Sequence, residues 1–134
     1  MKYYVIKDNK SNSHQLVEVN SEIAADGYFI SPEDFQHLQE VQQQAYKRNN
    51  LVDMNSNIIF TIANIVKQSR YIHVDQYITL IEDFINLFYD CKSRTTKVIY
   101  DDEFVSMIYD CYIARHGVID LELIQMILKE LEKQ

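Results

Sequence analysis

The chain has 134 residues, the usual size of one domain, and 47% of them are hydrophobic while 25% are charged. Its net charge is −7, which argues against nucleic acid as a partner, because nucleic-acid binding depends on neutralising phosphates with Lys and Arg. No apolar run approaches the roughly 20 residues of a membrane-spanning helix, and the N-terminal residues lack the apolar core of a signal peptide. The prediction is one cytoplasmic domain, residues 1–134, with no membrane partner.

The first thirty residues are predicted to form a small antiparallel sheet. Lys2–Lys7 is aromatic and β-branched, His14–Val19 alternates in polarity, and Tyr28–Ile30 follows the turn signal Asp26-Gly27. Two or three strands are marginal in water by themselves, so this sheet is expected to pack on helices.

The rest of the chain, residues 31–134, is predicted to be helical. Ser31 is placed to cap a first helix with Pro32 at its first position, Gly117 to end a fourth helix in a left-handed conformation, and Asp120 to cap the last. Apolar residues at helical spacing predict helices over about 31–48, 55–69, 74–91, 101–115 and 121–133. The predicted fold class is therefore α+β, mainly α: a small N-terminal antiparallel β-sheet packed with a bundle of about five helices.

Two of these predicted helices share a sequence pattern. Residues 82–91 align without gaps to residues 102–111, and Phe, Tyr, Asp and Cys coincide in the two segments. Two explanations stay open: the segments are neighbouring structural equivalents, or they are two amphipathic helices that use the same limited set of residues. Two copies are too few to predict a solenoid.

The same pattern places two cysteines at equivalent positions. Cys91 and Cys111, with Asp90 and Asp110 beside them, offer metal or redox chemistry if the helices lie side by side. A structural zinc site takes four ligands at close spacing, and free Cys usually packs as a small hydrophobe. We therefore predict no metal site and no cofactor.

The helices predicted over residues 101–133 also suggest a helix-turn-helix. In such a motif the second helix enters the major groove with groups that donate to base edges and phosphates. Here that helix begins with Asp120 and Glu122, and its first basic residue is Lys129. A helical hairpin that closes the core is the favoured interpretation, and a DNA-binding transcriptional regulator is the alternative function.

Catalytic patterns are weak throughout the sequence. No His has a nucleophile or carboxylate at a spacing that would orient it as an acid or base, and no P-loop or other motif of catalysis is present. The basic segment Lys92–Lys97 lacks the glycines of a phosphate loop and is interpreted as a solvated connector, although it is where an anion is expected if the protein binds one. We predict a protein that is not an enzyme.

Tyrosine is the residue in excess, with ten copies against six Phe. Tyrosines interspersed with acids, as in the stripe formed by Tyr100, Tyr109 and Tyr112, are typical of contact surfaces, and an acidic surface suits a basic partner. The predicted partner-binding residues are Tyr100, Asp101, Asp102, Glu103, Tyr109 and Asp110. The functional hypothesis is a small acidic regulatory or inhibitory factor of a bacterium, phage or mobile element that binds another protein with a basic surface. A homo-oligomeric structural protein, such as a homodimer, is a second alternative.

Overall fold

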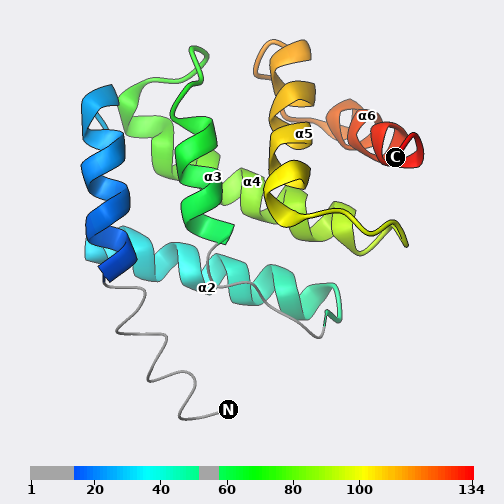
Figure 1. Cartoon of the computed structure of the whole chain (residues 1–134), viewed down its shortest axis with the longest axis horizontal. Coiled ribbons are helices and arrows are strands. Elements are labelled where there is room, and N and C mark those ends of the chain that lie inside the picture. Colours follow the sequence, from blue (N-terminus) through cyan, green and yellow to red (C-terminus); the bar gives the residue numbers. More distant parts are fainter. Residues whose placement is uncertain (1–13, 52–57) are drawn as a thin grey trace.

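The protein is all-α in the part of the chain that the computed structural model describes, residues 14–51 and 58–134 (Figure 1). These residues form six helices and no strand. The helices are residues 14–23, α2 (Pro32–Arg48), α3 (Ile58–Val66), α4 (Tyr77–Lys92), α5 (Asp101–Ala114) and α6 (Leu121–Glu132), with short 3-10 turns at Ala24–Asp26 and Val74–Gln76. The predicted α+β class is wrong, whereas each of the five predicted helices has a counterpart.

The predicted second strand, His14–Val19, is part of the first helix. Its alternation extends over only six residues, and the longer pattern is helical: Val19 and Ile23, one turn apart, are buried, whereas Val17 is 69% exposed. A helical period therefore explains the apolar positions better once Ile23 is included. The predicted strand over residues 2–7 lies outside the described residues.

The predicted third strand, Tyr28–Ile30, is irregular backbone that leads into α2. Ile30 is fully buried, and a buried peptide group requires hydrogen-bond partners. The side chain of Asn20 supplies them: its Oδ1 accepts from the Ile30 N–H at 2.8 Å and its Nδ2 donates to the Ile30 carbonyl at 2.9 Å. One amide thus satisfies the groups that a neighbouring strand would otherwise have paired.

The predicted caps at Ser31 and Asp120 and the predicted left-handed Gly117 are confirmed. The Ser31 hydroxyl accepts from the Asp34 N–H at 3.0 Å, and the Asp120 carboxylate accepts from the Leu123 N–H at 3.0 Å. Gly117 has a φ of 81°, in the left-handed region, and its N–H donates to the Tyr112 carbonyl at 3.0 Å. A Cβ at Gly117 would lie 2.5 Å from the Cβ of Tyr71, so close packing as well as backbone conformation favours glycine here.

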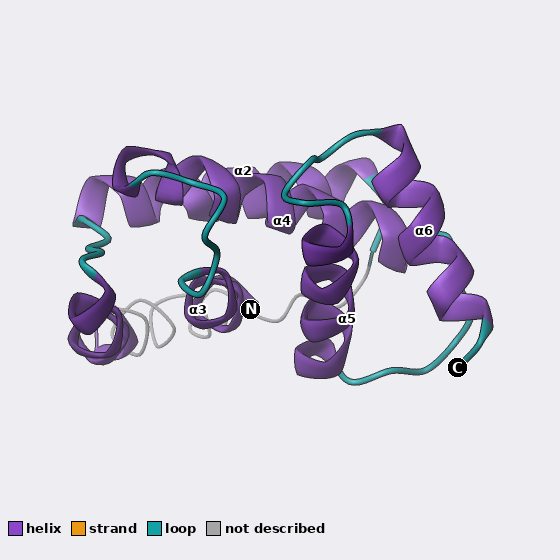
Figure 2. Ribbon diagram, turned by 90° about the horizontal axis from the view of Figure 1, so that it is seen from above, coloured by secondary structure: helices purple, strands orange, loops and turns teal. Residues whose placement is uncertain are grey.

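Helix α4 is the centre of the bundle. It contacts α2, α3, α5 and α6, and its aromatic side chains Phe84 and Phe88 are fully buried. Helix α2 runs alongside α4, whereas α5 crosses it and continues through a turn into α6 (Figures 1 and 2). Each of the other labelled helices therefore packs on α4, but α5 and α6 form one end of the molecule.

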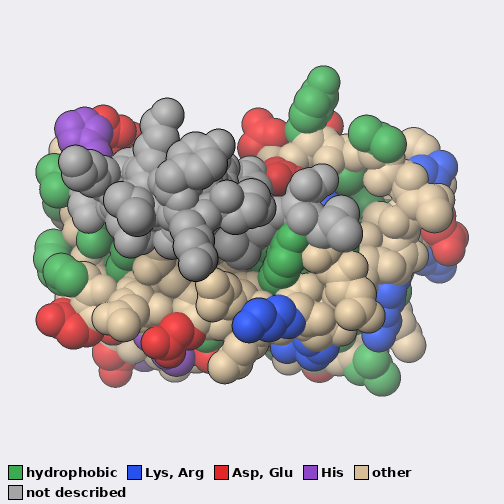
Figure 3. Space-filling model, turned by 90° about the horizontal axis from the view of Figure 1, so that it is seen from below, with side chains coloured by type: hydrophobic (Ala, Val, Ile, Leu, Met, Phe, Trp, Pro, Cys, Tyr) green, Lys and Arg blue, Asp and Glu red, His purple; other side chains and the backbone are tan. Residues whose placement is uncertain are grey.

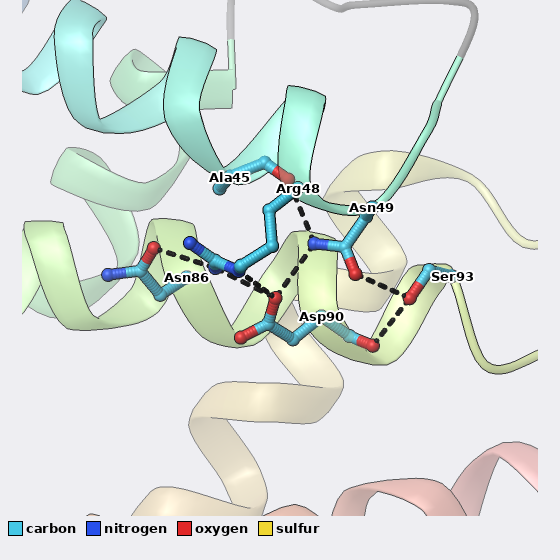
Figure 4. Close-up of polar contacts among 6 residues, drawn as sticks. All are labelled: Ala45, Arg48, Asn49, Asn86, Asp90 and Ser93. Carbon is cyan, nitrogen blue, oxygen red and sulfur yellow. Dashed lines mark hydrogen bonds and ion pairs between the residues drawn. The ribbon is translucent and has the colours of Figure 1, made fainter.

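The C-terminal ends of α2 and α4 are joined by a polar network (Figure 4). Arg48 donates to Asp90 at 2.8 Å and to the Asn86 side chain at 3.2 Å. Asn49 also donates to Asp90, at 2.7 Å, and Ser93 donates to the Asn49 side chain at 2.8 Å. This network links the ends of α2 and α4 at the edge of their apolar contact.

No helix among the described residues is long and apolar enough to cross a membrane.

Candidate functional site: an acidic groove between α5 and α6

An open groove of about 620 Å³ runs along α5 and is walled on one side by α6. Its size lies within the range of surface sites that bind ligands or side chains of a partner. The residues that line it come from four segments: Ile65 of α3, Ile99 of the loop before α5, Asp102, Glu103, Ser106, Met107, Asp110, Cys111 and Ala114 of α5, and Met126, Glu130 and Gln134 from α6 and the C-terminus. We call it the α5–α6 groove.

The apolar and charged residues of the α5–α6 groove lie at different depths. Cys111 is buried, and the apolar side chains Ile65, Ile99, Met107 and Met126 are half-buried and pack against the core. The three α5 carboxylates, by contrast, are exposed. The groove therefore has an apolar floor beneath an acidic rim.

Helical spacing explains why these residues meet. Asp102, Ser106 and Asp110 follow one another at intervals of four, so they form one row along α5. Met107 and Cys111 form the next row, closer to the core. One stretch of α5 thereby supplies both the acidic rim and part of the floor.

The position of α6 beside α5 is held by Arg115, which follows the last turn of α5. Its guanidinium forms ion pairs with Asp120 at 2.7 Å and with Glu122 at 3.0 Å. Since both carboxylates belong to the start of α6, this side chain links the two helices across the turn that contains Gly117.

The rim carboxylates are free of cations in the described part of the chain. Asp102, Glu103 and Asp110 form no ion pair there, whereas Glu130 is 3.0 Å from Lys133. Asp102 and Glu103 lie in the first turn of α5, where the helix dipole favours negative charge. Asp110 lies beyond the first turn, so the helix dipole does not explain why an acid occupies this position.

The structure divides the six predicted binding residues. Asp102, Glu103 and Asp110 come together in the groove. Asp101 instead forms an ion pair with Lys92 at 3.2 Å, and Tyr100, the N-cap residue of α5, is 76% exposed beside the groove-lining Ile99.

The remaining tyrosines of the predicted stripe lie elsewhere. The Tyr109 ring packs against Phe84 at 6.3 Å and Tyr112 at 5.7 Å between ring centroids, away from the groove. Tyr112 is fully buried, and its hydroxyl is 2.7 Å from the Ser69 hydroxyl. The three tyrosines therefore do not form one surface stripe.

Several groove residues were not predicted from the sequence. Met107 lies within the predicted acidic segment and one turn from Asp110, so its spacing could have identified it. Ile65, Met126 and Glu130 come from α3 and α6, and their approach to α5 depends on tertiary packing, which the sequence pattern does not reveal.

A family model described as a family of unknown function, DUF6323, matches residues 15–134. The chain belongs to DUF6323. The DUF6323 match includes every residue that lines the α5–α6 groove. No curated protein and no solved structure matches the chain.

The two cysteines of this DUF6323 chain are free and buried. Burial raises the pKa of Cys91 to about 11, and Asp90 and Cys111 add to the rise while Arg94 opposes it. Burial also raises the pKa of Cys111. Within residues 14–51 and 58–134, no three His, Cys, Asp or Glu side chains gather as they would around a metal ion.

The basic loop after α4 borders a second, smaller hollow of about 330 Å³. Arg94 and Lys97 line it together with Glu132, whose carboxylate would oppose an anion. Lys97 also donates to the Gln134 carbonyl at 3.0 Å. On the face shown in Figure 3, Lys and Arg side chains gather on the half of the molecule that carries this loop and α6. The basic loop therefore lies at the same end of the molecule as the acidic groove.

Proposed function

We propose that this protein acts as a small regulatory or inhibitory factor that binds another protein through the α5–α6 groove, by contact and without catalysis. The observation that carries the proposal is the combination of an apolar floor with three carboxylates that form no ion pair in the described part of the chain. The partner that such a surface fits has apolar side chains surrounded by Lys or Arg.

The two parts of the groove contribute differently to binding. Burial of a large apolar side chain stabilises a contact by about 1.5–3 kcal/mol, so the floor of Met and Ile residues supplies most of the affinity. An exposed ion pair contributes about 0.2–1 kcal/mol. The carboxylates therefore act mainly on the choice of partner and on the rate of association.

The negative rim also disfavours other classes of partner. Asp102, Glu103 and Asp110 would lie against phosphates if the groove met nucleic acid or an acidic lipid surface. At the start of α6, Asp120 and Glu122 are paired with Arg115 and would face the DNA backbone in a helix-turn-helix arrangement. A basic protein surface has no such conflict.

The experiment compares affinity capture from native lysate by three forms of the full chain. Ser106→Arg places a long cation in the exposed middle of the groove, and Gln44→Arg adds the same cation at an exposed position of α2. We expect the wild type and Gln44→Arg to capture the same proteins, and Ser106→Arg to lose them. Equal capture by all three forms would contradict the proposal, as would the absence of any specifically captured protein.

A further inference from the structure

We propose that the α5–α6 groove receives one amphipathic, Lys- or Arg-bearing helix of the partner, which lies along α5 as α2 lies along α4. This inference rests on the proposed function, because it names the element that the groove recognises.

The two helices carry equivalent rows of polar residues. In the alignment of residues 82–91 with 102–111, Glu82 and Asp90 of α4 correspond to Asp102 and Asp110 of α5. Each pair of acids is eight residues apart, with a small polar residue midway between them. Both rows therefore present two carboxylates about 12 Å apart along one side of a helix.

On α4 this row is half-buried and pairs with side chains of α2. His37 lies 3.1 Å from Glu82, and Arg48 lies 2.8 Å from Asp90. Arg48 also donates to Asn86, the middle residue of the row, at 3.2 Å (Figure 4). On α4, therefore, the element that pairs with the acidic row is an amphipathic helix with basic groups at its edge.

On α5 the same row opens into the groove. Asp102, Ser106 and Asp110 are exposed, and neither carboxylate forms an ion pair in residues 14–51 and 58–134. Beneath them the apolar floor has no equivalent of α2 over it within those residues. On α4, helix α2 pairs with the carboxylates and packs on the apolar surface. On α5, the corresponding carboxylates and apolar floor are available to a partner.

The length of the groove fits a short helix. The residues of α5 that line it run from Asp102 to Ala114, which corresponds to about 18 Å at the helical rise of 1.5 Å per residue. On α2, His37 and Arg48 are about 17 Å apart by the same rule. A partner helix of three turns, with cations at both ends of its apolar stripe, matches this span.

Other occupants fit the groove less well. An extended peptide usually binds by joining a strand edge, and the described residues contain no strand. A second copy docking groove to groove would place two acidic rims against each other, which is unfavourable at short range. A basic helix meets neither obstacle.

The test measures binding of a labelled peptide to the full chain by fluorescence anisotropy at low and high salt. The peptide has the length of α2, Ala and Gln as filler, Leu at the positions of Phe35, Leu38, Val41, Gln42 and Ala45, and Lys at the positions of His37, Gln44 and Arg48. One control peptide has the same composition in shuffled order, and another has Glu in place of Lys.

Two matched variants of the protein complete the design. The first neutralises the rim with Asp102→Asn, Glu103→Gln and Asp110→Asn. The second makes the same change of net charge at exposed acids elsewhere, with Glu33→Gln, Glu40→Gln and Asp75→Asn. Both variants also remove acids from the first turn of a helix, so their effects on folding are comparable.

We expect the Lys peptide to bind at least about tenfold more tightly than either control peptide, and its binding to weaken in high salt. The rim variant should weaken binding about tenfold, and the second variant by less than about twofold. Equal binding of the three peptides, or equal loss in the two variants, would overturn the helix inference.

A failure of this inference can be told apart from a failure of the proposed function. If the Lys peptide does not bind but Ser106→Arg still loses the proteins that the wild type captures, the groove binds a partner of another shape. If Ser106→Arg loses nothing either, both proposals are wrong. Binding of a free polyamine in place of the peptide would also overturn the helix inference.

Discussion

Two segments with similar sequences, residues 82–91 in α4 and 102–111 in α5, have different surroundings. Phe84 and Phe104 are both buried, and so are Cys91 and Cys111. The acids differ: Asp90 is held by Arg48 and Asn49, whereas Asp110 is exposed on the rim of the groove. The Phe and Cys positions are therefore equivalent in burial, and the acid positions are not.

The difference arises from a neighbouring helix. Helix α2 packs along α4 and pairs with its outward row, whereas the outward row of α5 is exposed in the groove that α6 walls on one side. The same residue types thus form part of an internal interface in one segment and part of an open groove in the other. A residue pattern indicates which side of a helix is compatible with packing, but the rest of the fold decides whether a neighbour is present.

The largest expected effect concerns the shared aromatic position. Phe84→Ala and Phe104→Ala should each lower the free energy of unfolding by about 3–5 kcal/mol, because both rings are buried and their removal leaves a cavity. Chemical denaturation of both variants measures this. A loss below about 1 kcal/mol in only one of them would show that the two positions are not equivalent.

The pH dependence of stability separates the two thiols. The pKa of Cys91 rises from 9.0 to about 11 on folding, so between these pH values the unfolded state has fewer bound protons and the free energy of unfolding falls as pH rises. This contribution is fully present below pH 9 and amounts to about 3 kcal/mol, because each pKa unit corresponds to about 1.4 kcal/mol.

Urea denaturation at several pH values tests this prediction. Cys91→Ala should reduce the loss of stability between neutral pH and pH 11, and Cys111→Ala should reduce it less. If both variants lost stability with pH as steeply as the wild type, burial would not be holding the proton on Cys91.

The hydroxyl groups of Tyr89 and Tyr109, which occupy aligned positions, should contribute differently to stability. Gln42 donates to the buried Tyr89 hydroxyl at 2.9 Å, so Tyr89→Phe should lower the free energy of unfolding by about 1–2 kcal/mol. Tyr109 is half-buried, and Tyr109→Phe should change stability by less than about 0.5 kcal/mol. Equal effects of the two changes in thermal denaturation would contradict the difference in surroundings.

The smallest effect is expected at the acids. Asp90→Ala removes hydrogen bonds from Arg48 and Asn49 and should cost about 1 kcal/mol, because the network is partly exposed. Asp110→Ala should be neutral within about 0.5 kcal/mol. A clear loss of stability in Asp110→Ala would mean that this carboxylate stabilises the fold and is not available to a partner.

The sequence predicted the helices better than their arrangement. Caps such as Ser31 and Asp120 are local signals, so α2 and α6 begin where the sequence places them. The strands predicted over residues 14–19 and 28–30 are wrong, because a six-residue alternation also occurs within a helix, and because the role of Asn20 in pairing the Ile30 backbone depends on tertiary structure.

The candidate site was predicted only in part, because the sequence shows local spacing but not tertiary contacts. Asp102, Glu103 and Asp110 lie on one helix and could be grouped by their spacing. Tyr109 and Tyr112 lie close to these acids in the sequence, yet both rings pack on Phe84 of α4. The sequence could not show this, because the side of α5 that faces the core depends on how α5 packs on α4.

An NMR titration of the isotope-labelled full chain with the Lys-bearing helical peptide locates the binding surface directly. We expect amide shifts to concentrate along α5 between Asp102 and Ala114 and near Met126 and Glu130 of α6, and we expect the rim variant to lose them. Shifts centred instead on the basic loop at residues 92–97, or on the α2 side of α4, would show that the α5–α6 groove is not the binding site.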